Sequence, residues 1–138
     1  MKILILLSLS IIAVPAIADQ SVNLKSRYIE NYAKEVMPTM RIRMKERMPD
    51  LEPDLLNFIL ETTTKKMANC AYDSLEHYPD TYRKLSISSI ASGVTLQDST
   101  SKVEALMLED IGSGVITQQK VNSIVELAHA KIKSCMKA

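Results

Sequence analysis

The stretch from Pro53 to Glu76 constrains the fold most, because it is the longest uninterrupted helical pattern in the chain and carries one of only two cysteines. Its apolar and small residues recur at spacings of three and four, which places a single stripe on one helix face: Leu55, Leu56, Ile59, Thr63, Met67, Cys70 and Ala71. Cys135 follows Ile132 by three in the last helical pattern. Both sulfur atoms are therefore expected to point into the core, from helices that are neighbours.

Residues 1–18 have the pattern of a secretory signal peptide. Lys2 supplies the positive start, Ile3 to Val14 is apolar, and Ala16-Ile17-Ala18 is a small-residue cleavage signature. The apolar run is too short to span a bilayer of ~30 Å, which needs about twenty residues, so a retained anchor is the weaker interpretation. We expect cleavage after Ala18, export to the periplasm, a helical domain over residues 19–138 and no stable membrane insertion.

Export determines how the cysteines are interpreted. A pair in an oxidising compartment usually forms a disulfide, so we predict a bond between Cys70 and Cys135. Closing this loop of about 65 residues would stabilise the fold by roughly 4 kcal/mol. Two buried free thiols are the alternative, and the spacing excludes a CxxC redox site.

Charge limits the classes of partner. Lys2 is the only charged residue of the signal, so the rest of the chain carries 16 basic and 16 acidic side chains. A net charge of zero argues against nucleic acid or a membrane surface as a general partner.

Helical periodicity covers nearly all of the domain, and no stretch has the alternation of a strand. The expected segments run from Ser21 to about Val36, from Pro53 to Glu76, from about residue 80 to 92, from about 96 to 111, and from 118 to 136. Pro38 either kinks the first helix or opens a new one, and 48–53 is a turn in which Asp50 is a good capping residue. We predict an all-α, single-domain bundle of five or six helices with one disulfide.

The later helix boundaries rest on capping residues. Gly93 is expected to end the helix that starts near Asp80, in the left-handed conformation that glycine adopts at low cost. Thr95 and Ser101 are both possible caps for the following helix, and Thr117 is expected to cap the last one.

Methionines recur along one face after the first helix, at Met37, Met40, Met44 and Met48. Packing in a core is the main interpretation, since methionine fills irregular apolar space. A flexible groove for a partner, or thioether ligands for Cu(I), are the alternatives.

Two surfaces are candidates for contact with a partner. The first is basic, with Arg41, Arg43 and Arg47 interleaved with the methionines. A solvated face neutralised by Asp50, Glu52 and Asp54 is the main interpretation, and contact with an acidic partner or an anionic polymer such as envelope glycan is the alternative. The second surface is the turn at Pro79, which gathers three of the five tyrosines, a residue type favoured in interface anchors: Tyr72, Tyr78 and Tyr82. Packing of the helix corner by these tyrosines, with their hydroxyls reaching water, is the alternative.

Catalytic and metal patterns are weak. Glu126 and His129 have the i, i+3 spacing of di-metal carboxylate bundles, and Asp73 and His77 are four apart, but the further carboxylates of such a site are missing. No phosphate-binding glycine loop or nucleophile elbow is present. We therefore predict no enzyme activity, no metal site and no cofactor.

These patterns together predict an exported protein that binds another protein in the periplasm. Bacterial immunity proteins share the format of signal, small helical domain and single disulfide, though no common motif is visible. The first hypothesis is an immunity or inhibitor-type protein that neutralises an envelope-acting toxin or hydrolase. The alternatives are a periplasmic chaperone or stress adaptor with a methionine-lined groove, and a small copper carrier.

Overall fold

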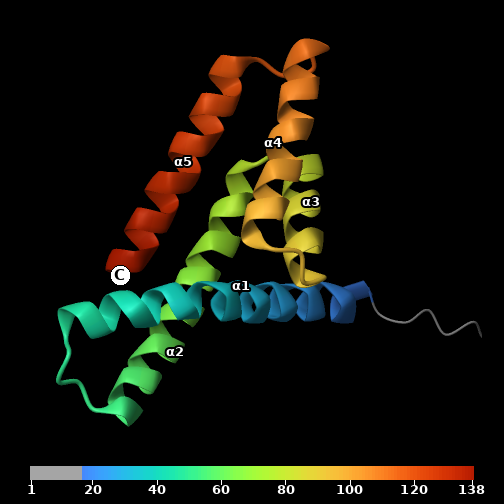
Figure 1. Ribbon diagram of the computed structural model, residues 1–138. Helices are drawn as coiled ribbons and strands as arrows, with labels where there is room; N and C mark the ends of the chain where they lie inside the picture. The colour runs from blue at the N-terminus through green and yellow to red at the C-terminus, as the bar shows by residue number, and fades with distance from the viewer. Residues whose placement is uncertain (1–16) are drawn as a thin grey trace, which may run out of the picture.

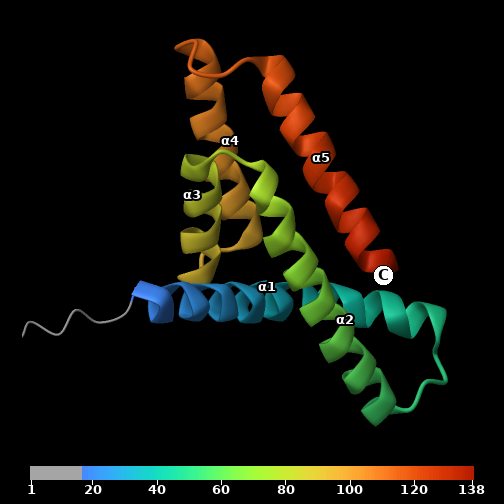
Figure 2. The same ribbon diagram turned by 180° about the vertical axis from the view of Figure 1, so that it is seen from behind.

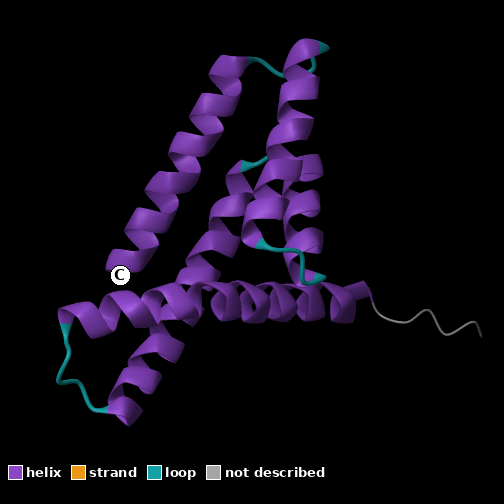
Figure 3. Cartoon of the chain, viewed as in Figure 1, coloured by secondary structure: helices purple, strands orange, loops and turns teal. Residues whose placement is uncertain are grey.

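The computed structural model describes residues 17–138, and these residues form only helices, turns and short loops. Five α-helices and one short 3-10 helix follow in the order α1 (Ile17–Arg47), α2 (Pro53–Ser74), η1 (Leu75–His77), α3 (Asp80–Ala91), α4 (Leu96–Gly112) and α5 (Gln118–Lys137). The prediction of an all-α bundle is confirmed (Figure 3). The signal-peptide prediction lies outside the described residues, except that α1 begins at Ile17, just before the predicted cleavage point.

The helices are arranged around the crossing of α1 and α2 (Figures 1 and 2). α1 packs against α2 and α3, α2 packs against α5, and α3 packs against α4. α4 and α5 share a turn at one end and diverge from it toward α1, so they do not pack together along their lengths (Figure 1). The end of α1 and the start of α2 project from the rest of the molecule.

α1 begins at Ile17, so the predicted start at Ser21 is wrong. It passes through Pro38 as one helix and ends at Arg47, so the predicted end near Val36 and the new helix at Pro38 are also wrong. Proline removes one hydrogen bond within a helix, to the carbonyl of Lys34. Pro38 and Lys34 are both exposed, which leaves that carbonyl open to water. α2 contacts α1 before the proline, through Tyr72 at Tyr28, and after it, through Asn57 at Arg41, and this packing sustains the helix on both sides.

The turns follow the predicted chemistry at most positions. Gly93 and Gly114 have φ of +90° and +78°, the left-handed conformation in which a side chain is strained. Thr95, not Ser101, caps α4 by accepting from the N–H of Asp98, and Thr117 caps α5 in the same way. Asp50 does not cap α2, because that helix begins at Pro53 after Glu52, which makes no side-chain cap.

The buried face of α2 is rotated from the predicted stripe. Leu56, Cys70 and Ala71 are buried as expected, but Leu55 is exposed. Leu60, Thr64 and Ala68 are fully buried instead. The cause is that α2 is covered by two partners, α1 and α5, on adjacent faces. The Thr64 hydroxyl is tolerated there because it donates to the carbonyl of Leu60 at 2.8 Å.

The disulfide between Cys70 and Cys135 is present and ties α2 to α5, as predicted. The two Cα atoms are 5.7 Å apart, within the normal range for such a bond. Cys70 is fully buried and Cys135 is half-buried.

One turn of α1 holds the junction between α3 and α4. The Asn31 side chain donates to the carbonyls of Ile90 (2.9 Å) and Ala91 (3.3 Å), at the end of α3. The Glu35 carboxylate accepts from the N–H of Leu96 at 2.8 and 3.0 Å, which satisfies a free donor at the start of α4. α1 is therefore fixed to α2 on one side and to the α3–α4 turn on another.

Candidate functional site

The clearest candidate for a contact surface is the elbow, which we define as residues 37–60: the second half of α1, the loop at 48–52 and the first part of α2. Figure 1 shows this part projecting away from α3, α4 and α5. Only Leu56 and Leu60 are buried within it.

Large apolar side chains are exposed at the elbow. Ile42 is 60% exposed and Phe58 67%, and Met48 and Leu55 are also exposed. Half of the large exposed apolar side chains of the described chain lie in this one region. Single exposed apolar residues are ordinary, but a concentration of them typically marks a site of association.

The predicted basic residues also lie in the elbow. Arg43 and Arg47 are exposed, whereas Arg41 is half-buried and donates to Asn57 Oδ1 at 2.8 Å. Within residues 23–138, no ion pair joins these arginines or Lys45 to a carboxylate. Among the described residues the basic side chains therefore make no direct pair with the acidic residues at 50–54, and a solvated face that these acidic residues neutralise at longer range does not require one.

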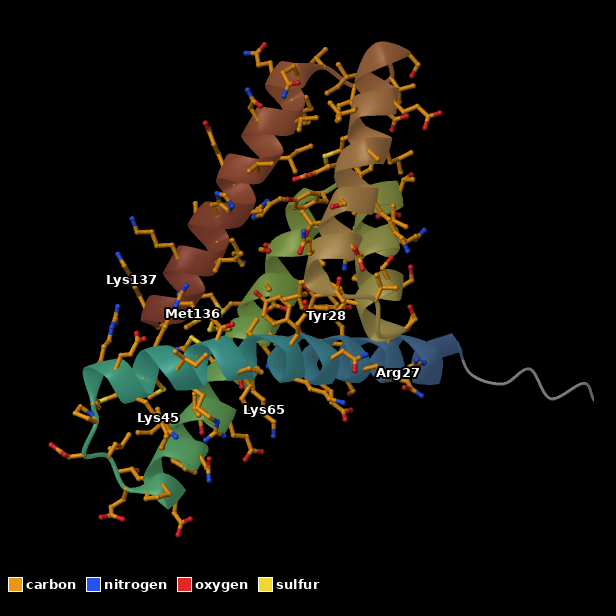
Figure 4. The ribbon with its side chains drawn as sticks, viewed as in Figure 1. Arg27, Tyr28, Lys45, Lys65, Met136 and Lys137 are labelled. Carbon is orange, nitrogen blue, oxygen red and sulfur yellow. A yellow bond between two sulfur atoms is a disulfide. The ribbon has the colours of Figure 1, made fainter. Side chains whose placement is uncertain are left out.

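A groove of about 1080 Å³ runs between α1 and α2 beside the elbow, and we call it the elbow groove. Ile29, Ala33 and Met37 give it an apolar wall from α1, and Asn57, Glu61 and Lys65 line it from α2. Figure 4 shows Lys65 and Lys45 on the same side of α1. Charges of both signs surround the groove, since Glu30 and Lys34 also line it.

The methionine row lies partly in this groove. Met37 lines it, Met40 and Met44 are half-buried, and Met48 is exposed. None of the four is buried, so the main interpretation, core packing, is wrong for this row. The row continues the apolar face of α1 beyond the part that α3 covers, which periodicity alone cannot reveal.

The tyrosine turn divides into one core residue and two partly covered ones. Tyr82 is only 3% exposed, and its hydroxyl donates to Asp110 at 2.5 Å, linking α3 to α4. A buried side chain cannot anchor a partner directly, so Tyr82 leaves the proposed contact surface. Tyr72 and Tyr78 are half-buried. Lys25 lies 4.7 Å from the Tyr72 ring centroid and pairs with Asp73 at 3.2 Å, so Tyr72 is also held within the fold.

A second groove, which the sequence did not indicate, lies between α4 and α5. This central groove has a volume of about 470 Å³ and is lined from every α-helix. Tyr28, Tyr32 and Leu75 line its inner part, and the exposed residues Glu104 and His129 lie at its edge, on α4 and α5. Figure 4 shows Tyr28 on the side of α1 opposite to Lys45 and Lys65.

The tyrosines of the central groove are close to one another. The rings of Tyr28 and Tyr32 are stacked with their centroids 5.9 Å apart, and Tyr72, which does not line the groove, meets Tyr28 edge-on with the centroids 5.3 Å apart. Burial first, and then the neighbouring Tyr32, Tyr72 and Tyr78, raise the pKa of Tyr28. Burial and then the Glu104 carboxylate raise the pKa of Tyr78. These hydroxyls therefore remain protonated and can donate hydrogen bonds at all ordinary pH values.

The residues of the weak metal patterns do not come together in a metal-binding group among the described residues. Glu126, His129 and Lys131 are exposed along α5, and Glu76 pairs with Lys131 at 2.9 Å. Among the described residues, no three His, Cys, Asp or Glu side chains come together in a group able to hold a metal ion. In the same part of the chain, none of the helices has the length and apolar character needed to cross a membrane.

Comparison with protein-family models, with curated proteins and with solved structures finds no match for this chain.

Proposed function

We propose that this chain is an exported protein-binding protein of the immunity or inhibitor type, which holds an envelope-acting toxin or hydrolase at its elbow. The observation that carries the proposal is the elbow itself, where exposed apolar side chains project together with basic side chains that have no ion pair among the described residues, beside a groove of about 1080 Å³.

The exposed apolar side chains support a protein as the partner. Fully burying a large apolar side chain gains about 1.5–3 kcal/mol, so covering Ile42 and Phe58, each about two-thirds exposed, would gain about 1–2 kcal/mol apiece. Aromatic residues, Met and Arg are the types enriched in protein interfaces, and the elbow supplies all three.

The elbow has four basic and four acidic side chains and so no net charge, but its exposed arginines offer positions for individual carboxylates of a partner. Arg43 and Arg47 are exposed and have no ion-pair partner among the described residues, so a partner's carboxylates could pair with them. Complementary charges of this kind raise the association rate and make it depend on salt. The disulfide supports an oxidising compartment, in agreement with the signal-peptide pattern of residues 1–18.

The test begins with a pull-down of the tagged protein from periplasm, where we expect one partner in equal amount. Arg43→Glu with Arg47→Glu should slow association and weaken its salt dependence. Phe58→Ala should speed dissociation by about tenfold, because hot-spot aromatics cost more than 1 kcal/mol when truncated.

Matched controls separate the elbow from exposed residues in general. Leu108 on α4 is 66% exposed, as Phe58 is, so Leu108→Ala should leave dissociation unchanged. Lys102→Glu on α4 is the control for charge. Tyr78→Ala tests the turn at Pro79, and an effect there with none at the elbow would move the contact surface to that turn.

A chaperone is the second candidate, because Met37 lines the elbow groove and Met48 is exposed. Flexible thioether side chains adapt to many apolar segments. A chaperone would suppress aggregation of unrelated unfolded proteins and would give no single partner in the pull-down. Suppression lost in Met37→Ser with Met48→Ser would favour this function over inhibition.

A further inference from the structure

The central groove has the size of a small-molecule site. Such sites have volumes of ~300–1000 Å³ and are mostly apolar with a few polar groups, which describes this groove of about 470 Å³.

The charge at the groove favours a cationic ligand. Among the described residues that line it, Glu104 is the only carboxylate, and no lysine or arginine is present. His129 faces it from α5. Lys131 and Glu76, nearby, are paired with each other. The elbow groove differs, because charges of both signs line it and it therefore favours neither a cationic nor an anionic ligand.

The aromatic lining of the groove also favours a cationic ligand. Tyr32 and Tyr78 line the groove and are half-buried, so their rings can meet a ligand, and the negative faces of aromatic rings attract a cation that lies within about 6 Å. Tyr28 also lines the groove, but it is buried against Tyr32 and Tyr72 and supports their rings from within. Val103, Met107 and Ile132 supply an apolar wall for the rest of the ligand.

We propose that the central groove binds a free small amphiphile with an apolar body and an ammonium group, the ammonium lying between the Glu104 carboxylate and the tyrosine rings. This site is distinct from the elbow and does not depend on the proposed partner. The ammonium would pair with the one carboxylate at the edge, and the apolar body would lie between α4 and α5, displacing water from their facing sides.

Decyltrimethylammonium, used below the concentration at which it forms micelles, is the probe. The chain has no tryptophan and five tyrosines, three of which line the groove, so tyrosine fluorescence reports binding directly. Calorimetry should give one site. Decanoate, which has a similar chain and the opposite charge, should bind at least tenfold more weakly, and tetramethylammonium, which lacks the chain, should not bind measurably.

Glu104→Gln keeps the shape of the side chain and removes its charge. It should weaken decyltrimethylammonium about fivefold, the effect expected of a largely solvated charge pair, and leave neutral decanol unchanged. Glu109→Gln, on the same helix and outside the groove, is the matched control and should change nothing. Both residues are exposed, so the variants are expected to fold.

Four results would overturn the proposal: no binding, equal binding of decanoate, a Glu104→Gln variant that binds as the wild type does, or amide chemical-shift changes that centre on the elbow. Phosphatidylcholine carries the same quaternary ammonium group in a lipid, so vesicles of this lipid test whether the ligand is a free molecule or a membrane headgroup. Co-sedimentation with phosphatidylcholine vesicles that Glu104→Gln abolishes would assign the site to a lipid headgroup instead.

Discussion

α5 depends on the disulfide more than any other helix, and this dependence leads to a quantitative prediction. Only Ile124 and Ala128 are buried on α5, and the helix does not pack along α4. Its remaining links are the turn at its start, contacts with α2 and η1, the exposed ion pair between Lys131 and Glu76, and the bond at Cys135. An exposed ion pair contributes about 0–1 kcal/mol, so the disulfide is the main constraint on the end of this helix.

The size of the effect follows from the loop that the bond closes. The cysteines are 65 residues apart, and the chain-entropy model gives about 4 kcal/mol for a loop of this length. Cys70→Ala with Cys135→Ala should therefore destabilise the domain by about 4 kcal/mol. The serine pair should lose about 1 kcal/mol more, because residue 70 is fully buried and a hydroxyl there is desolvated.

Urea unfolding of the oxidised protein and of both double variants measures these differences. Amide hydrogen exchange then tests where the stability is lost, since local opening exchanges amides without global unfolding. In the alanine pair we expect residues 124–137 to exchange faster by a larger factor than residues 60–71 of α2.

Two results would refute the reasoning. A loss of less than 1 kcal/mol in the alanine pair would mean that α5 is held by its packing and not by the bond. Equal acceleration of exchange in α2 and α5 would mean that the bond acts only by constraining the unfolded chain, the effect from which the ~4 kcal/mol is calculated, and that α5 has no additional local dependence on it.

Three further predictions concern polar groups. The Ser99 hydroxyl is buried with no hydrogen-bond partner among the described residues, so Ser99→Ala should stabilise the domain by about 1–2 kcal/mol in urea unfolding, and a loss of stability would show that the hydroxyl is satisfied. The hydrogen bond to Asp110, and then burial, raise the pKa of Tyr82 from 10.0 to about 12, so the stability that this tyrosine contributes below pH 10 is lost as the pH rises through 12. Tyr82→Phe should therefore make the decline of unfolding free energy over this pH range shallower, and an unchanged decline would contradict the prediction. Glu35→Ala should cost about 1 kcal/mol and speed exchange of the first amides of α4, because the N–H of Leu96 loses its acceptor; unchanged exchange there would mean that water replaces the carboxylate without cost.

The fold could be predicted from the sequence where local chemistry decides it. The turn at 48–53, the caps at Thr95 and Thr117 and the left-handed Gly93 all depend on residues close in the chain. The Cys70–Cys135 bond could be predicted because both cysteines are in phase with apolar stripes and the compartment was inferred independently. The helix break predicted at Pro38 was wrong, because packing on both sides of the proline outweighs the hydrogen bond that proline removes.

The candidate sites could be predicted only in part. The sequence shows which residues share a helix face but not how far along that face a neighbouring helix reaches. Met44 and Ile29 therefore give the same signal, although the first lies in the projecting elbow and the second packs against the core. The central groove was missed for a related reason, because its defining feature is that α4 and α5 diverge, and no local pattern records an angle between helices.

α1 is a wall of both proposed sites, which raises the question of whether they are coupled. The adjacent residues Tyr32 and Ala33 line different grooves, the first the central groove and the second the elbow groove. Coupling would require α1 to have two positions that the ligands distinguish. Its crossing with α2 and the hydrogen bonds of Asn31 and Glu35 to the α3–α4 turn hold it in one. We therefore expect saturating decyltrimethylammonium to change the partner's affinity less than twofold. A larger change, reciprocated in the affinity of the amphiphile, would mean that α1 moves as a unit and that the small ligand controls the protein contact.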